Sequence, residues 1–231
     1  MRKKMVVLTG AGMSAESGLR TFREMGGLWE EYDVAEVASP MGWAKDMDLV
    51  LRFYNERRQQ LALSEPNQGH IGLAEFEKFF DVQVITQNVD DLHERAGSTR
   101  VLHLHGELKK VRSTIDPQLV YDIGYKEILR GDLCEKGSQL RPHIVWFGEF
   151  VPAIEEAAEI CQNADFLAVI GTSLNVYPAA GLIDYVPMNT EVFLIDPNDI
   201  SAPVKRKITF IKEKASVGVG KLNEILLGNQ E

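Results

Sequence analysis

Residues 5–18 read MVVLTGAGMSAESG, a short apolar run that ends in a loop of small residues. The run from Met5 to Thr9 has the length and composition of a strand that is buried on both faces. Gly10 and Gly12 follow it directly, and glycine permits both a tight turn and the close approach of a ligand to the backbone. This stretch therefore predicts a strand that opens an α/β fold and delivers a glycine loop to a ligand site.

The same loop carries helix-capping residues. Ser14 and Ser17 can cap a helix that follows, and the N-terminus of such a helix is a natural phosphate site. The stretch is similar to a dinucleotide-binding loop, but Ala15 stands where the common G-x-G-x-x-G pattern has its third glycine. A βα turn that is merely rich in small residues is the alternative interpretation.

Further apolar runs of strand length lie along the chain, at Val82–Thr86, Val101–Leu104, Phe166–Ile170, Glu191–Ile195 and Ile208–Ile211. Helical stretches separate them, at Asn67–Phe80, Pro152–Ala164 and Ser216–Leu227. Within the first helical stretch, the apolar residues at helical spacing are Ile71, Ala74, Phe76 and Phe79. Strands that alternate with helices predict an α/β fold with a Rossmann-like, doubly wound parallel sheet.

Two segments break this alternation. Residues 31–63 read as helical with no strand between the helices, and residues 109–146 begin with a polar, mixed stretch that contains several turn signals. We expect these two segments to form a smaller inserted module. The Rossmann-like nucleotide-binding domain would then consist of residues 1–30, 64–108 and 147–231.

Composition excludes several classes of protein. The chain has 231 residues, 45% of them hydrophobic, and a net charge of −9, which argues against a partner that is a nucleic acid or an anionic membrane. Its two cysteines exclude a disulfide framework and favour a reducing compartment. The first apolar run is too short for a signal peptide or a membrane span. We expect a cytoplasmic protein.

Polar side chains follow the strand that ends at Thr86. Gln87, Asn88 and Asp90 lie at the carboxyl edge of the predicted sheet, where α/β folds bind ligands. They predict a polar pocket that binds a ligand. The alternative is an Asx-type turn that caps the next segment.

A histidine follows the next strand. His105 precedes Gly106, and an imidazole can accept a proton near neutral pH. His103 lies two residues earlier, and we expect it to point to the opposite face of the strand and to serve only in packing.

Taken together, the motifs resemble those of the sirtuins, the NAD-dependent protein lysine deacylases. Besides residues 10–23, they are Thr86–Asp90, His103–Gly106, Leu140–Glu149 and Gly171–Pro178, in the order typical of that family. The resemblance implies an enzyme that transfers acetyl or acidic acyl groups (succinyl or malonyl) from lysine side chains of proteins or peptides to ADP-ribose, with release of nicotinamide. An NAD glycohydrolase or ADP-ribosyltransferase, or a non-catalytic NAD-binding regulator, would use the same NAD site and are the alternatives.

The resemblance also implies roles for individual residues. His105 is implied to be the general base, and Asn88 the second catalytic residue. The implied NAD contacts are Gly10, Ala11, Gly12, Ser14, Ala15, Phe22, Arg23, Gln87, Asn88, Asp90, Gly171, Thr172, Ser173, Asp196 and Ala215. Asp196 stands where the family usually has an asparagine, and its carboxylate would disfavour the 2′-phosphate of NADP.

Two further sets of residues concern the acylated substrate. The resemblance implies that the peptide binds as an added strand between two extended segments, through Val145, Phe147, Gly148, Asn175 and Val176. Tyr54 and Arg57 share one face of a helix and can bind a carboxylate, although an amphipathic helix with a packed tyrosine and a solvated arginine explains them too. With Ala15, they match the sirtuin subgroup that removes succinyl, malonyl and glutaryl groups.

One departure from the family concerns zinc. Sirtuins usually carry two C-x-x-C pairs, which form a tetrahedral zinc site. The corresponding positions here are Ser113, Asp116, Cys134 and Gly137, so we expect no zinc. We expect apolar packing to hold the small module instead, through Val111, Ile115, Leu119, Val120, Tyr121, Ile123, Tyr125, Ile128 and Leu129.

Overall fold

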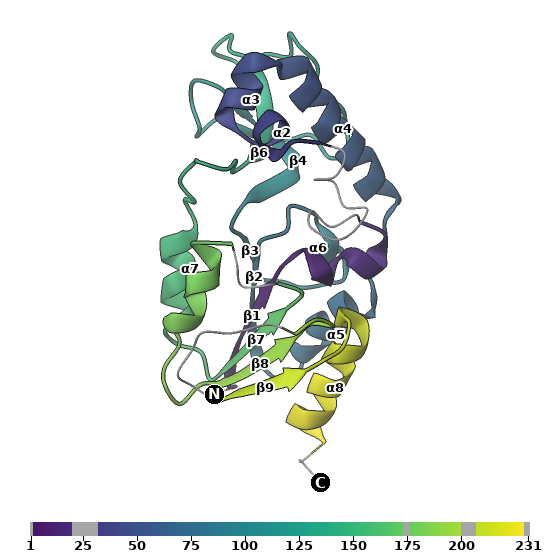
Figure 1. Cartoon of the computed structure of the whole chain (residues 1–231), viewed down its shortest axis with the longest axis vertical. Coiled ribbons are helices and arrows are strands. Elements are labelled where there is room, and N and C mark those ends of the chain that lie inside the picture. The colour runs from purple at the N-terminus through teal and green to yellow at the C-terminus, as the bar shows by residue number, and fades with distance from the viewer. Residues whose placement is uncertain (1, 20–31, 173–175, 200–206, 229–231) are drawn as a thin grey trace.

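The computed structural model describes residues 2–19, 32–172, 176–199 and 207–228, and in these ranges two sheets organise the fold (Figure 1). The larger is a parallel sheet with the strand order β3-β2-β1-β7-β8-β9. Its strands are β1 (Lys4–Thr9), β2 (Asp81–Thr86), β3 (Val101–His103), β7 (Phe166–Ile170), β8 (Glu191–Ile195) and β9 (Ile208–Ile211). The six apolar runs of the sequence therefore form one doubly wound sheet, as predicted.

Helices cover both faces of this sheet. Successive side chains of each buried strand point to opposite faces, so the apolar residues on each face need their own packing partner. Met5 and Val7 of β1 pack in the core beneath α5 (Gln68–Phe76) and α8 (Ala215–Leu227). Val6 and Leu8 pack on the other side, against α7 (Ile154–Cys161) and the 3-10 helix η3 (Ala179–Asp184). Figure 1 shows α5 and α8 on one side of the sheet and α7 on the other. Among the described helices, none is both long and apolar enough to cross a bilayer.

Of the apolar stripe expected on α5, only Phe76 is buried, and the rest of the prediction is wrong. The helix buries Gly69, His70, Leu73 and Phe76, whereas the side chains of Ile71 and Phe79 are 37% and 52% exposed. Two stripes at helical spacing compete in this segment, and the helix ends at Phe76, so Phe79 lies in a turn. The face with the small Gly72 and buried Leu73 is the one that approaches α8, where Val219 leaves no room for a Cβ on Gly72.

Helices α2 (Val34–Val37), α3 (Pro40–Lys45) and α4 (Met47–Leu63) pack near a second sheet, which is antiparallel with the order β5-β4-β6. Its strands are β4 (Gly106–Ser113), β5 (Val120–Asp122) and β6 (Leu140–Ile144). Two side chains of α4 tie the helices to this region: Asn55 Nδ2 donates to the carbonyl of Ile128, and Arg58 Nε to that of Leu108 (2.9 and 2.8 Å). The boundaries between this part and the rest of the chain stay a prediction.

The apolar set expected to hold this part divides in two. Val111 and Ile128 are buried with Leu51 of α4, whereas the side chains of Ile115 and Leu129 are 66% and 58% exposed. Both exposed residues lie in the connections between the strands, Ile115 after β4 and Leu129 after β5, and not in the strands themselves.

Candidate functional site

The site lies where the order of the parallel strands reverses. From β1 the chain moves outward through β2 and β3, and later returns to β7, which pairs with the other edge of β1. The carboxyl ends of β1 and β7 therefore meet, and such a switch point leaves a crevice for a ligand. The backbone amide of Gly10 donates to the carbonyl of Ile170 at 3.0 Å, and that of Gly12 to the carbonyl of Gly171 at 2.9 Å.

Glycine is required on both sides of this contact. A Cβ on Gly10 would lie 2.7 Å from Cβ of Thr172, and a Cβ on Gly12 would lie 2.8 Å from Cα of Gly171. Gly171 also has a φ of +61°, in the left-handed region that favours glycine. Two loops are thus packed together at the end of the sheet with no side chains between their backbones, and we call this pair of loops the cradle.

The glycine loop does not lead straight into a capped α-helix within the described residues. Up to Leu19 it forms two 3-10 turns, η1 (Ala11–Met13) and η2 (Ala15–Ser17). The hydroxyl of Ser14 makes no cap bond and instead donates to Oδ2 of Asp90 at 2.9 Å. The serine predicted as a cap is therefore part of the polar pocket.

Asn88 and Asp90 complete this buried group. Asn88 Nδ2 donates to the carbonyl of Gly10 at 3.0 Å and to the hydroxyl of Ser14 at 3.1 Å. Oδ1 of Asp90 accepts from the amide of Leu92 at 3.2 Å, which is the Asx-type turn considered as an alternative to the pocket. Burial raises the pKa of Asp90, while the bonds from Leu92 and Ser14 oppose that shift. The pocket and the turn therefore exist together.

His105 lies beside this group and has a defined tautomer. Its Nδ1 is 3.0 Å from the carbonyl oxygen of Gln87, which can only accept, so Nδ1 carries the proton and Nε2 keeps its lone pair. Burial lowers the pKa of His105, although the bond to Gln87 opposes this. The side chain of Gln87 donates to the hydroxyl of Thr172 at 3.1 Å. The structure thus places a neutral imidazole next to the cradle.

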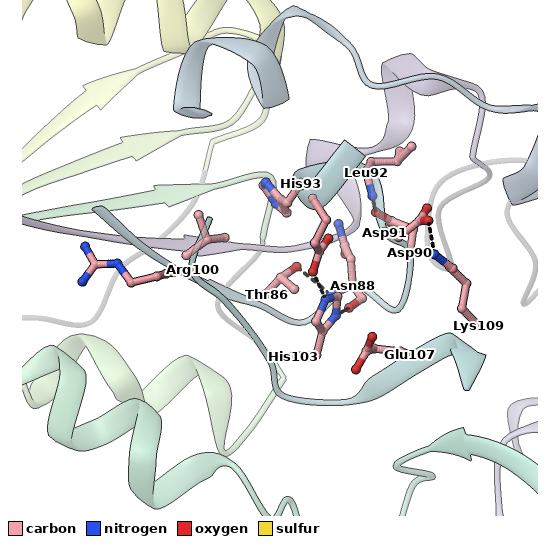
Figure 2. Close-up of polar contacts among 12 residues, drawn as sticks. Thr86, Asn88, Asp90, Asp91, Leu92, His93, Arg100, His103, Glu107 and Lys109 are labelled. Atoms are coloured by element: carbon pink, nitrogen blue, oxygen red, sulfur yellow. Dashed lines mark hydrogen bonds and ion pairs between the residues drawn. The ribbon is translucent and has the colours of Figure 1, made fainter. Parts of the chain in front are cut away.

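The expectation for His103 is wrong. Its Nδ1 is 3.1 Å from the carbonyl oxygen of Asn88 (Figure 2). His103 and His105 therefore contact consecutive carbonyls of one loop. Residues two apart along extended backbone share a face, and this periodicity should have placed the two rings on the same side. His103 therefore belongs to the site.

Tyr54 and Arg57 lie on α4, and Arg57 is at the wall of the pocket. The cavity next to the cradle is lined by Ala11, Ser14, Leu19, Arg57, Gln60, Gln87, Asn88, Val89, Asp90 and Leu108. The Tyr54 hydroxyl accepts from Nε1 of Trp146 at 3.0 Å, and burial raises the pKa of Tyr54 to about 12, so the phenol keeps its proton as a donor. Burial lowers the pKa of Arg57, but a guanidinium stays charged in proteins. Sequence reasoning missed Trp146, Gln60 and Leu108.

The predicted peptide-binding segment after β6 is a turn and not an extended strand. The amide of Glu149 donates to the carbonyl of Trp146 at 3.0 Å, and Gly148 has a φ of +89°. The amides of Val145 and Phe147 donate to the carbonyls of His105 and Ala38 (2.9 and 3.0 Å). Val145 is therefore next to His105, as a substrate contact would require, and the exposed Phe147 lies on the surface beyond it.

The remaining predicted residues form two groups. Some lie at the end of β8, before η3 or at the start of α8, and the others lie outside the described residues. The half-buried Asp196 follows β8, and its Oδ1 accepts from the amide of Asn198 at 2.9 Å. Ala215 is buried at the start of α8, whose Ser216 donates to Glu16 of the glycine loop. The carbonyl of Val176 accepts from the amide of Ala180 at 2.9 Å. Phe22, Arg23, Ser173 and Asn175 lie outside the described residues.

The four positions that correspond to the zinc cysteines do not fit a zinc ion. Cys134 Sγ donates to the hydroxyl of Ser113 at 3.4 Å, and Asp116 pairs with Lys136 at 2.7 Å. Gly137 offers no side chain at all. No three His, Cys, Asp or Glu side chains are gathered for a metal ion anywhere in the described ranges. The absence of zinc stays a prediction.

Comparisons with known proteins agree with this geometry. The sequence model of the Sir2 family matches residues 10–178. The NAD-dependent protein deacylase of Bacteroides thetaiotaomicron is 54% identical over 230 residues, which cover 97% of this chain and 98% of that protein. A crystal structure of a Sir2 homologue in complex with NAD is similar with a TM-score of 0.88 at 38% identity, over 100% of this chain and 91% of that one. A Sir2 mutant with a deacetylated p53 peptide and 3′-O-acetyl ADP-ribose is similar with a TM-score of 0.81 at 26% identity, over 97% and 94% of the two chains.

Proposed function

The chain belongs to the Sir2 family, and from that premise we propose that it is an NAD-dependent protein lysine deacylase. The observation that carries this proposal is the neutral His105 beside the glycine cradle, with the lone pair of Nε2 available to take a proton. A regulator that only binds NAD would need the cradle but not a base held in one tautomer. The 54% identical relative is itself an NAD-dependent protein deacylase.

NAD is a substrate in this reaction, and the residues of the cradle suit it. It supplies a glycosidic bond that breaks readily, since its positively charged leaving group departs as neutral nicotinamide. The loops at Gly10, Gly12 and Gly171 carry no side chains, so a diphosphate could approach their backbone closely. Asn88 and Asp90 would bind the carboxamide of the nicotinamide, and Gln87 a ribose hydroxyl. Asp196 would accept hydrogen bonds from the adenosine ribose.

His105 would act as the general base. Its Nε2 would take the proton of a ribose hydroxyl, and that oxygen would then accept the acyl group that leaves the lysine nitrogen. The acyl carbonyl oxygen would take the place of nicotinamide on the ribose carbon, and a water molecule would supply the oxygen that remains on the acyl group. Acyl-lysine, NAD and water would thus give acylated ADP-ribose, nicotinamide and the free lysine amine. This outcome agrees with the 3′-O-acetyl ADP-ribose bound to the Sir2 mutant to which this chain is similar. Val145, next to His105, would bind the backbone of the peptide.

We further propose that acidic acyl groups are accepted besides acetyl. Arg57 lines the cavity together with Ala11 and Ser14, and its guanidinium can bind a carboxylate with two hydrogen bonds. The proton of the Tyr54 hydroxyl would provide a further bond, because the oxygen of that hydroxyl already accepts from Trp146. Ala15 is small and would leave room for a longer acyl chain. Succinyl and malonyl groups are the substrates that suit such a pocket.

One incubation tests the proposal. The protein would be mixed with NAD and a set of peptides that carry acetyl-, malonyl-, succinyl- or unmodified lysine, and the products would be followed by mass spectrometry. We expect acylated ADP-ribose, nicotinamide and free lysine in equal amounts. Free ADP-ribose formed without an acylated peptide would indicate an NAD glycohydrolase instead, and the absence of turnover would indicate a regulator. Turnover of acetyl-lysine alone would contradict only the acidic selectivity.

A further inference from the structure

His103 faces a hydrogen-bond acceptor at each of its ring nitrogens. Nδ1 is 3.1 Å from the carbonyl oxygen of Asn88, and Nε2 is 2.8 Å from Oε1 of Glu94 on α6 (Leu92–Arg95). A carbonyl and a carboxylate both only accept, so both nitrogens must carry a proton for the two bonds to exist. The ring is therefore a cation in this arrangement, and its side chain is only 7% exposed.

The charges around the ring support this protonation state. Burial alone would lower the pKa of His103, but the hydrogen bond and negative charge of Glu94, the charge of Glu107 on β4 and the bond to Asn88 together raise it. Asp90, in the loop between β2 and α6, also interacts with the ring, while His93 on α6 is the neighbouring imidazole. His93 is neutral, because burial holds its pKa well below the usual value. Figure 2 shows Asn88, Asp90, His93 and Glu107 around His103.

The carbonyl that accepts from His103 belongs to Asn88, whose other polar groups also form hydrogen bonds within the pocket. The backbone amide of Asn88 donates to the hydroxyl of Thr86 at 3.0 Å, and its side-chain amide donates to Gly10 and Ser14. Nδ1 of His105 donates to the adjacent carbonyl, that of Gln87. Two imidazoles thus hold consecutive carbonyls of one loop, His105 as a neutral ring and His103 as a cation.

We propose that His103 is a positioning residue, which holds the Asn88 loop in its NAD-binding shape only while both ring nitrogens are protonated. This inference rests on the proposed function. When the ring loses a proton, one nitrogen presents a lone pair to the oxygen of Asn88 or Glu94, and that contact becomes repulsive. Since the pKa of His103 is raised above its ordinary value, the contact is fully present below that ordinary value and is lost as the pH rises through the raised one. The affinity for NAD should therefore fall on the alkaline side.

The test compares pH profiles of kcat/KM for NAD, measured with an acetyl-lysine peptide, between the wild-type protein and Glu94→Gln. Glutamine keeps an oxygen that accepts from Nε2 but removes the charge that raises the pKa of His103. We expect the alkaline limb to move to lower pH by about one unit, the low end of the usual effect of an adjacent opposite charge. The limb should appear in KM for NAD, and the acid limb set by His105 should not move.

Two more variants sharpen this result. His103→Gln replaces the titrating ring with an amide that does not titrate, so the alkaline limb should disappear and kcat/KM for NAD at neutral pH should fall. Glu156→Gln, on the exposed face of α7, removes the same charge from the opposite side of the sheet and should leave the profile as it is. If His103→Gln does not fold, the shift in Glu94→Gln alone decides the matter.

The inference is overturned if the wild-type protein has no alkaline limb, or if Glu94→Gln and Glu156→Gln give the same profile. Binding of NAD in the absence of peptide, measured by calorimetry across the same pH range, separates this failure from that of the proposed function. A protein that binds NAD with the expected alkaline loss but does not turn over acylated peptides would contradict the function and leave the role of His103 standing.

Discussion

The protonation state of each imidazole around the pocket follows from the atoms that its ring nitrogens face. His105 meets one carbonyl and stays neutral, while His103 meets two acceptors and is a cation. His70 and His93 pack edge to face with their ring centroids 4.9 Å apart, and burial lowers the pKa of both, that of His70 to about 4. Four neighbouring histidines therefore perform different tasks, and the residue type alone does not distinguish them.

His105→Ala tests the base directly. We expect the variant to bind NAD and peptide but to transfer the acyl group about 10²–10⁴-fold more slowly, which is the usual contribution of a general base. In the wild-type protein the rate should fall with decreasing pH only below about pH 6.5, because burial lowers the pKa of His105 below its ordinary value. Rates from single turnovers, measured with saturating NAD, provide the comparison. Acyl transfer at the wild-type rate would show that another group takes the proton.

A double substitution, Tyr54→Phe with Arg57→Met, tests whether this pair binds the carboxylate of an acidic acyl group. We expect desuccinylation to fall about 10- to 150-fold, because a hydrogen bond to a charged group contributes roughly 1.5–3 kcal/mol. Deacetylation should change little, since an acetyl group has no carboxylate to bind, and it serves as the internal control. Comparable losses of kcat/KM on succinyl- and acetyl-lysine peptides would mean that the pair only maintains the shape of α4.

Part of this site could be predicted from the sequence for a physical reason. Gln87, Asn88, Asp90 and His105 directly follow apolar strands, and the carboxyl ends of parallel strands meet at one edge. Trp146 could not be found in this way. Its indole donates to a hydroxyl 92 positions away, on a helix that no local pattern connects to the end of β6.

At the scale of elements, the turn after β6 is held by a cluster of charged side chains. Glu149 accepts from Arg141 at 2.7 and 3.0 Å, from Arg112 at 3.1 Å and from the backbone amide of Trp146 at 2.8 Å. The guanidinium of Arg141 also lies over the Trp146 ring, 3.3 Å from its centroid. The carboxylate thus fixes the position of Trp146, and through it the hydroxyl of Tyr54.

Glu149→Gln tests this arrangement. The neutral amide cannot balance two arginines, so we expect the free energy of unfolding to fall by about 2–3 kcal/mol, less than the roughly 3–5 kcal/mol for breaking a fully buried pair. The KM for the peptide should rise, and desuccinylation should fall more than deacetylation. Urea unfolding and steady-state kinetics measure the two effects, with the exposed Glu155→Gln as the matched control. If both variants behave alike, the cluster does not hold the turn.

The large sheet could be predicted almost to the residue, and the small one could not. The runs at residues 82–86, 166–170 and 191–195 are buried on both faces or nearly so, which leaves an apolar signal with no competing pattern. Strand β4 instead contains Lys109, Lys110 and Arg112, alternates only in part between buried and half-exposed positions, and has an irregular register against β6. Its own residues give no clear strand pattern, and it is extended because it pairs with β5 and β6.

At the scale of the molecule, apolar packing and hydrogen bonds join the antiparallel sheet to α4. Leu51, Val111 and Ile128 form a small core between them, and the side chain of Asn55 both donates to the carbonyl and accepts from the amide of Ile128. At the far end, the hydrogen bond between Cys134 and Ser113 and the ion pair between Asp116 and Lys136 occupy the positions where the family usually has cysteines. The apolar packing and these two polar contacts connect the segment around residues 113–116 to the segment around residues 134–137, which a zinc ion would otherwise join.

We therefore expect the purified protein to contain no stoichiometric zinc, and its activity and melting temperature to be unaffected by a chelator. A structural zinc site is closed by four nitrogen or sulfur ligands, and thiolates usually come in pairs. Ser113 and Gly137 cannot supply such ligands, so Asp116 and Cys134 provide at most two, and the Lys136 ammonium beside Asp116 already neutralises one of them. Elemental analysis after dialysis against a chelator is the decisive measurement. About one zinc ion per chain would refute the expectation, and it would mean that ligands such as His143 or Glu135 reach the ion from positions outside the expected four.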